Sequence, residues 1–270
     1  MDERILTDLS DHALTTAIKA NLYALFRDFG RSPQAEVYED TGLMRWRTDV
    51  AHPWFSGVVS SAPPVGDEAK TIQEAVSYFR SHRAPYFTLW LAPDLALDPW
   101  ARQLEPHGFH HDGNTPGMAV DLAVLPGSVR QPAGLVIEHV GTAPKMQEWA
   151  RTFAAGYGLP APVVGPIHDL FLSLGLGLPY RYYLAHLGAK PVAASMLFLG
   201  AGVAGIYCVA TLTEARGQGI GGAVTLAPLL EARDMGYRAG ILQASDMGYG
   251  VYRRLGFKTY CAMDHFFWSA

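Results

Sequence analysis

The feature that most constrains the fold of this chain is a glycine-rich segment, with glycine at four of the six positions from Gly217 to Gly222. The apolar pattern predicts a strand before this segment and a helix after it that ends near Gly236. The first amide groups of a helix lack partners within the helix and lie at the positive end of its dipole, so they can surround a phosphate. Arg216 precedes the glycines and adds a positive charge. The segment therefore predicts a phosphate-binding loop, although a tight turn that only packs the helix on the sheet needs the same glycines.

Two kinds of phosphate ligand fit this loop. Gly217, Gly219 and Gly222 have the spacing of the dinucleotide-binding fingerprint, and Asp246 follows the next predicted strand, where an acid that binds ribose is expected. That fingerprint, however, belongs to the first strand of a parallel sheet. Here three predicted strands precede the loop, and the short turns between them are typical of antiparallel hairpins. These strands span 181–187, 191–199 and 205–211. The topology before the loop therefore disfavours an NAD-binding domain.

The same loop also has the pattern Arg-x-x-Gly-x-Gly at Arg216, Gly219 and Gly221. This pattern resembles the pyrophosphate-binding loop of the GNAT superfamily of N-acetyltransferases. Residues 209–217 are similar to the approach to that loop, and residues 252–257, Tyr-Arg-Arg-Leu-Gly-Phe, are similar to the family's helix that ends in Tyr-x-Lys/Arg-Leu-Gly-Phe. The two motifs stand in the family's order with one predicted strand between them, and the resemblance covers residues 134–270.

The resemblance implies an N-acetyltransferase that moves an acetyl group directly from acetyl-CoA, its co-substrate, to a primary amine of a small-molecule or amino-acid-like acceptor. The pantetheine arm is then expected along the strand at Val209, Ala210 and Thr211, where backbone amides would polarise the thioester carbonyl. Tyr252 is the expected general acid that protonates the departing thiolate. The loop residues that the resemblance assigns to cofactor binding are Arg216, Gly217, Gln218, Gly219, Ile220, Gly221 and Gly222.

Other polar residues are candidates that also have a structural interpretation. Ser245 follows the predicted strand 239–244, and it would either hydrogen-bond the pantetheine or the acceptor, or cap the next helix. Cys208 suits a buried apolar position better than a covalent acetyl carrier. No pattern identifies a general base. The candidates for that role, all of which also suit a solvated surface, are Glu138, Glu214, Asp246 and His168. The residues His107, His110, His111 and Asp112 lack the spacing of a metal site, so no metal is expected.

The chain of 270 residues is long enough for two domains, at roughly 150 residues per domain. A run rich in proline, glycine and serine predicts a linker at 126–133, between a domain over 1–125 and a domain over 134–270. Both halves end in a strand, a short helix, a Gly-Phe pair and another strand, with the pairs at 108–109 and 256–257. This order predicts a degenerate duplication, and hence an α/β chain with mixed sheets in two tandem GNAT-like folds.

The first half lacks the residues that carry the chemistry of the second. Leu104 stands where the duplication places the counterpart of Tyr252. The segment 60–66 replaces the phosphate loop, and it has one glycine, no arginine and two prolines, which lack N–H groups. We therefore expect the first domain to hold no acetyl-CoA and to help shape the acceptor pocket.

Composition excludes several classes of partner. The chain has 21 Lys and Arg against 25 Asp and Glu, a formal net charge of −4, so it has no excess of positive charge for nucleic acid or an anionic membrane. The longest apolar stretch, 170–178, is too short to span a bilayer. Two cysteines and an acidic start indicate the reducing cytoplasm. We therefore expect a cytoplasmic enzyme, monomeric or homodimeric, with a small amine substrate. A non-catalytic acyl-CoA sensor or scaffold and an NAD-dependent oxidoreductase are the alternatives.

Overall fold

The computed structural model describes residues 4–40, 43–60, 68–92, 95 and 97–270. Its contacts divide the chain into two units. Unit 1 contains Met1–Leu25 and Gly117–Tyr260, and unit 2 contains Phe26–Pro116 and Cys261–Ala270. The predicted linker at 126–133 therefore lies within unit 1 and does not separate the units.

Two long strands account for this difference. Strand β5 (Phe109–Asp121) begins in unit 2 and ends in unit 1, where its last residues pair with β10 (Ala239–Gln243). Strand β11 (Lys258–Ser269) begins in unit 1 and ends in unit 2, where it pairs with β4 (Tyr86–Leu91). Each half of the sequence thus supplies a strand segment to the sheet of the other unit. The prediction of the linker rests on local composition, which does not reveal pairing between distant strands.

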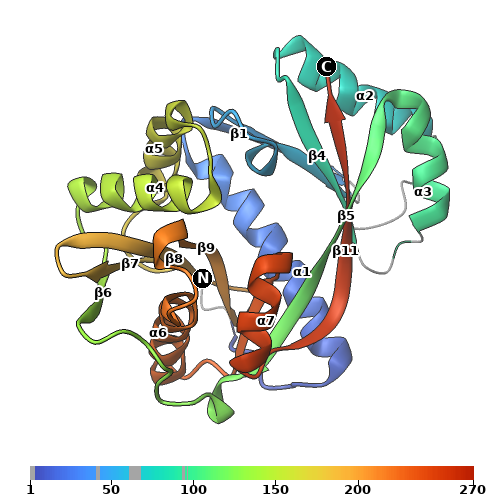
Figure 1. Ribbon diagram of the computed structural model, residues 1–270. Coiled ribbons are helices and arrows are strands. Elements are labelled where there is room, and N and C mark those ends of the chain that lie inside the picture. Colours follow the sequence, from blue (N-terminus) through green and yellow to red (C-terminus); the bar gives the residue numbers. More distant parts are fainter. Residues whose placement is uncertain (1–3, 41–42, 61–67, 93–94, 96) are drawn as a thin grey trace. The chain divides into compact units, whose positions relative to one another are not determined.

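Unit 1 is a mixed sheet between helices. Its strands follow the order β5-β10-β9-β8-β7-β6, in which β6 to β9 are antiparallel and β10 is parallel to β9. The helices α4 (Ala143–Tyr157) and α5 (Val164–Leu174) cover one face, and α6 (Ile220–Asp234) covers the other (Figure 1). The remaining elements of this unit are β6 (Leu135–His139), β7 (Tyr180–Leu187), β8 (Lys190–Gly200), β9 (Val203–Thr211), α7 (Asp246–Arg254) and most of α1 (Asp11–Asp28).

Helix α1 joins unit 1 through buried polar contacts with β8 and β9. The Asn21 side chain is fully buried, donates to the Gly200 carbonyl at 2.7 Å and accepts from the Tyr207 hydroxyl at 2.6 Å. A Cβ atom on Gly205 would lie 2.1 Å from the Asn21 Oδ1 atom, so only glycine allows the helix this close to the strand. These contacts hold the start of the chain against β9.

Helix α6 contains Pro228 and still runs without a break. Proline has no N–H group, so it leaves the carbonyl of Val224 without its helical donor. The fully buried Ser195 hydroxyl on β8 donates to that carbonyl at 2.7 Å. The sheet thus supplies the hydrogen bond that the proline removes, and the helix remains packed on β8 and β9.

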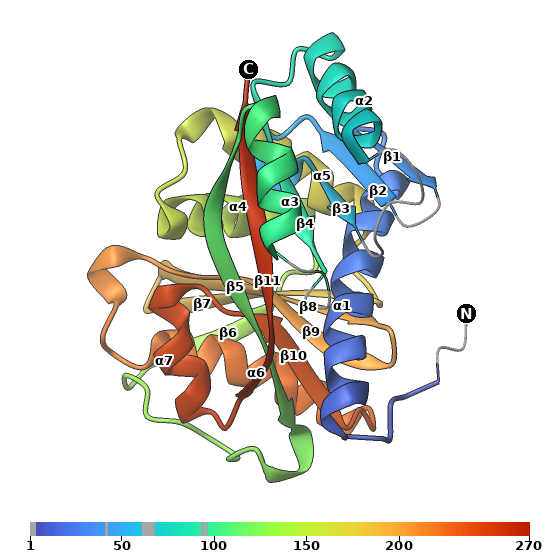
Figure 2. The same ribbon diagram turned by 90° about the vertical axis from the view of Figure 1, so that its right-hand side faces the viewer.

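Unit 2 repeats the pattern of a sheet with helices, and its strand order is β1-β2-β3-β4-β11-β5 (Figure 2). Gly108 and Gly256, from the two Gly-Phe pairs, both have a positive φ directly before the long strands β5 and β11. Leu104, the counterpart of Tyr252, is fully buried in the core of the unit. The other elements are β1 (Ala35–Asp40), β2 (Leu43–Thr48), β3 (Gly57–Ser60), α2 (Glu68–Ser81) and α3 (Leu97–Leu104). Most of the segment predicted to replace the phosphate loop, 61–66, lies outside the described residues.

Within the part of the chain that the structure describes, no helix is long and apolar enough to cross a membrane.

Candidate active site

The strands β9 and β10 are paired only at their beginnings. Their parallel ladder joins Ala204 to Gly240 and Gly205 to Ile241, while β9 continues to Thr211. On its other side β9 stays paired with β8 as far as Thr211. From residue 206 onward, β9 therefore has no strand partner on the β10 side among the described residues. An extended ligand can pair with such an edge as an added strand.

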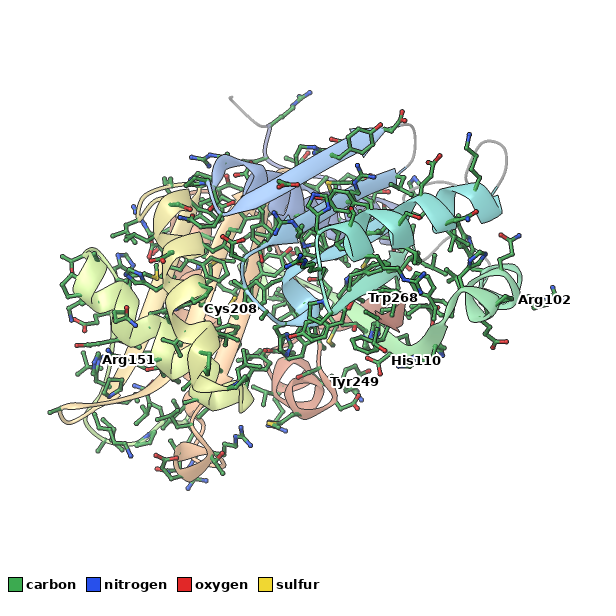
Figure 3. The ribbon with its side chains drawn as sticks, turned by 90° about the horizontal axis from the view of Figure 1, so that it is seen from above. Arg102, His110, Arg151, Cys208, Tyr249 and Trp268 are labelled. Carbon is green, nitrogen blue, oxygen red and sulfur yellow. The ribbon has the colours of Figure 1, made fainter. Side chains whose placement is uncertain are left out.

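A β-bulge lies in this part of β9. The pairing with β8 shifts between Ala194 opposite Ala210 and Met196 opposite Tyr207, so β9 holds an extra residue there. Cys208, labelled in Figure 3, has a φ of +54°, a left-handed conformation that is rare outside glycine. Such a bulge turns backbone amides out of the ladder beside Val209 and Ala210. Burial raises the pKa of the Cys208 thiol well above its usual range, so the thiol stays protonated and unsuited to act as a nucleophile.

The glycine loop presents its backbone to solvent. Gly217 and Gly219 have φ values of +76° and +85°, and both are exposed together with Gln218. Helix α6 begins at Ile220, so the amides of residues 220–222 form its first turn and have no partner within the helix. A Cβ atom on Gly219 would lie 2.1 Å from the Arg130 carbonyl oxygen. Glycine is thus required at position 219 for two reasons: the backbone has a positive φ, and the Arg130 carbonyl lies too close to leave room for a side chain.

Arg216 makes contacts other than those expected of it. Its Nε donates to the Thr211 carbonyl at 3.2 Å, and its Nη2 donates to the Gly156 carbonyl at 2.7 Å. A Cβ atom on Gly156 would lie 2.8 Å from the Ala210 Cβ, so the end of α4 packs directly on β9. The guanidinium therefore braces the end of α4 against the end of β9 through two of its three nitrogens. The positive end of the α6 helix dipole also lies at this loop and favours negative charge there.

Tyr252 lies on α7, and its side chain is only 7% exposed. Its ring packs against the backbone of Gly248, one turn earlier, where an added Cβ would lie 2.7 Å from the ring and 3.1 Å from the hydroxyl oxygen. No side chain among the described residues hydrogen-bonds the hydroxyl, and desolvation raises its pKa to about 12. Tyr252 is thus a fixed, protonated phenol with an unused donor.

Tyr157 is a residue that the sequence pattern did not single out. It ends α4, beside the contact of Gly156 with β9. Although the residue is 37% exposed, desolvation of its phenol raises the pKa, and the nearby Tyr252 and Cys208 raise that pKa further. The ends of α4 and β9 and helix α7 therefore bring two phenols and a thiol into one neighbourhood. No local signal marks Tyr157, because its neighbours come from distant parts of the chain.

Ser245 caps α7. Its hydroxyl oxygen accepts from the Gly248 backbone N–H at 3.2 Å. The structure thus shows the capping role, and the predicted contact with pantetheine or acceptor stays a prediction. The cap also sets the start of α7 at Asp246 and so fixes the helix that carries Tyr252.

The four candidates for a general base have other partners or are solvated. Glu214 forms an exposed ion pair with Lys190 at 2.7 Å, which lowers the pKa of its carboxyl. Glu138 pairs with Lys145, and Asp246 lies exposed in the first turn of α7. His168 lies 2.8 Å from its neighbour Asp169. Neither these three contacts nor the exposure of Asp246 points to the removal of a proton from an amine.

The histidines near residue 110 lie in unit 2. His111 and Asp264 are 2.9 Å apart on β5 and β11, and Asp112 and His265 are 3.8 Å apart on the same strands. Alternate residues of a strand face opposite sides of the sheet, so the two pairs do not combine. Across the described residues, no three His, Cys, Asp or Glu side chains gather in a group that fits a metal ion.

Comparison with solved structures identifies the fold as that of the GCN5-related N-acetyltransferases. A GCN5-related N-acetyltransferase from Kribbella flavida is 21% identical, with a TM-score of 0.66 over 93% of this chain and 94% of that chain. One from Sphaerobacter thermophilus is 17% identical, with a TM-score of 0.62 over 84% of this chain and 76% of that chain. A tandem GNAT protein from the clavulanic acid biosynthesis pathway is 17% identical, with a TM-score of 0.56 over 98% and 97%. No family model and no curated protein matches the sequence. The predictions of a GNAT fold and of a mixed α/β architecture are confirmed.

Proposed function

We propose that unit 1 is an N-acetyltransferase that uses acetyl-CoA to acetylate a primary amine of a small molecule. The observation that carries this proposal is that β9 and β10 separate beyond Gly205 directly beside an exposed glycine loop at the start of α6. The free edge of β9 can pair with an extended chain that carries amides, and the backbone amides of the loop can bind a pyrophosphate. Pantetheine and pyrophosphate are joined in that order in coenzyme A.

The residues present fit this co-substrate. The free edge of β9 at Val209, Ala210 and Thr211 would pair with the amides of the pantetheine arm. The backbone amides of residues 217–222 would bind the pyrophosphate, since glycines allow close approach and α6 adds its positive end. When bound, acetyl-CoA supplies an activated acetyl group as a thioester.

Two groups of the chain would then act on the transfer. Backbone N–H groups at the bulge, beside Val209 and Ala210, would stabilise negative charge on the carbonyl oxygen. As the amine nitrogen bonds to the acetyl carbon and the carbon–sulfur bond breaks, the Tyr252 hydroxyl would donate its proton to the sulfur, and the proton that the nitrogen loses would restore the phenol. A phenol with a pKa of about 12 is a weak acid, but burial also raises the pKa of the neighbouring Cys208 thiol. A thiolate in these surroundings is therefore more basic than in water, which reduces the mismatch.

Unit 2 differs from unit 1 at the equivalent place. Its parallel strands β3 and β4 stay paired along the whole of β3, from Gly57 with Thr88 to Ser60 with Leu91. The backbone edge that β9 leaves free in unit 1 is thus occupied by β4 in unit 2. We infer one acetyl-CoA site per chain, which allows a monomer to be active.

Release of free thiol from acetyl-CoA, measured across a panel of small primary amines, tests the proposed activity. We expect thiol release that requires an amine and is accompanied by acetylated amine in equal amounts. Binding of acetyl-CoA without turnover on any amine would favour an acyl-CoA sensor. Binding of NAD but not acetyl-CoA would favour an oxidoreductase and overturn the proposal.

A further inference from the structure

The hairpin of β1 and β2 in unit 2 places two arginines in different surroundings. Its register sets Arg47 opposite Glu36 and Arg45 opposite Tyr38. Arg47 accordingly forms an ion pair with Glu36 at 2.8 Å. Arg45 meets an aromatic ring instead of a carboxylate, although the two arginines are only two residues apart on the same face of β2.

The Arg45 guanidinium lies against two tyrosine rings. Its Cζ atom lies 4.4 Å from the centre of the Tyr38 ring and 4.0 Å from the centre of the Tyr78 ring on α2. The Tyr78 hydroxyl donates to Glu36 at 2.7 Å, which restrains its ring, and the hydroxyl of the more exposed Tyr38 donates to Asp40 at 3.4 Å. The planar cation is thus oriented before any ligand arrives, because both rings contact it.

The edge of this guanidinium lacks an acceptor. The described residues provide Arg45 with no ion pair and no hydrogen bond, and its Nε atom is buried without a partner. Because Nε is covered by protein, a ligand in solvent would reach the two terminal nitrogens of the guanidinium, which are not among the buried atoms. Arginine presents its donors as a planar fork that matches two oxygens of a carboxylate or a phosphate.

A groove of about 610 Å³ opens beside this arginine. The groove is wide and open to solvent, so a small polar ligand would be held there mainly by charge and hydrogen bonds. Helix α2 lines it with residues spaced three or four apart, which therefore share one face of the helix. Lys70 and Glu74 in this lining lie 3.9 Å apart, and both are exposed. The lining residues are Arg45, Lys70, Gln73, Glu74, Ser77, Tyr78 and Ser81. Two of these residues are cationic and one, Glu74, is acidic, so the lining carries a net positive charge, which favours an anion over an apolar ligand.

We propose that this groove of unit 2 is a binding site for a small molecule with an oxyanion group, a carboxylate or a phosphate, which the Arg45 guanidinium binds. The two tyrosine rings orient the guanidinium, and Lys70 adds a second positive charge at the groove. The site is independent of the acetyltransferase proposed for unit 1. This site would give unit 2, which we infer holds no acetyl-CoA, a ligand-binding role of its own.

Titration of the full-length, ¹⁵N-labelled protein with sodium phosphate and with sodium acetate, followed by NMR, tests this site. Sodium chloride at the same ionic strength is the reference. We expect a saturable shift of the Arg45 Nε–H signal and of the backbone amides of Gln73 and Ser77 with at least one of the two oxyanions. The oxyanion that binds more tightly identifies the ligand class. The absence of a saturable shift beyond that with chloride would overturn the proposal.

Three variants show whether Arg45 is responsible. In Arg45→Ala the affinity, read from the amides of Gln73 and Ser77, should fall at least about tenfold, as expected for a charge-assisted hydrogen bond. Arg45→Lys keeps the charge but not the fork, and it should weaken binding even if Arg45→Ala does not fold. Arg31→Ala removes an exposed arginine paired with Asp28 on the same unit and should bind like the wild type. Wild-type affinity in a folded Arg45→Lys or Arg45→Ala protein would contradict the assignment.

Discussion

Replacement of Tyr252 by phenylalanine is expected to lower kcat about 100-fold or more, because a positioned general acid contributes roughly 10²–10⁴-fold to a rate. The change removes only the hydroxyl, which has no hydrogen-bond partner among the described side chains. The fold and the KM for acetyl-CoA should therefore change little, by less than about threefold. Steady-state thiol release with saturating amine measures both constants. Wild-type kcat in Tyr252→Phe would remove Tyr252 from the mechanism.

Two glycines of α7 provide a matched control for the position of that hydroxyl. An alanine at Gly248 would place its Cβ 2.7 Å from the Tyr252 ring, whereas an alanine at Gly250 would approach only the flexible end of Arg254, at 3.5 Å. Both changes favour the helix equally. We expect Gly248→Ala to lower kcat by displacing the phenol and Gly250→Ala to leave it near the wild-type value. Equal kcat values in the two variants would show that the precise position of Tyr252 does not matter.

Replacement of Gly219 by alanine is expected to weaken acetyl-CoA binding at least about tenfold, or ~1.4 kcal/mol. The new Cβ would lie 2.1 Å from the Arg130 carbonyl oxygen, so the loop or the segment at Arg130 must move. The left-handed backbone, with φ at +85°, adds a cost of about 1–3 kcal/mol for a residue other than glycine. Calorimetric titration with acetyl-CoA measures the affinity, and thermal unfolding measures the stability.

Gly217 is the control for Gly219, since its φ is +76° and an added Cβ would meet no atom within 4 Å. Gly217→Ala should therefore lower the stability, because its backbone conformation disfavours alanine, but it should lower the affinity for acetyl-CoA less than Gly219→Ala does. If the two variants bind acetyl-CoA equally well, the close passage of Arg130 does not shape the phosphate loop.

Local patterns in the sequence predict much of unit 1. The strand that ends at Thr211, the loop from Gly217 and the helix from Ile220 depend on neighbouring residues, and their order was enough to indicate the GNAT fold. The positive φ values of Gly217 and Gly219 agree with the use of glycine there. Tyr252 was expected near the site from a motif of six consecutive residues, 252–257.

Features that depend on distant pairing were not predictable in this way. The Arg216 side chain binds the Gly156 carbonyl, which belongs to a helix 60 residues earlier, so a motif at the loop cannot reveal that contact. Because β5 and β11 each run from one unit into the other, the boundaries between the units do not lie at the linker predicted at 126–133. The surroundings of Arg45 depend on the register of the β1–β2 hairpin and on Tyr78 of helix α2. Neither can be predicted from the residues next to Arg45 in the sequence.

We propose that the separated strands β9 and β10 and the loop at the start of α6 form one acetyl-CoA site per chain. Calorimetric titration of the full-length protein with acetyl-CoA, with NAD titrated in parallel, measures this directly. We expect saturable binding of one acetyl-CoA per chain and no binding of NAD. Absence of acetyl-CoA binding, or binding of two molecules per chain, would contradict it.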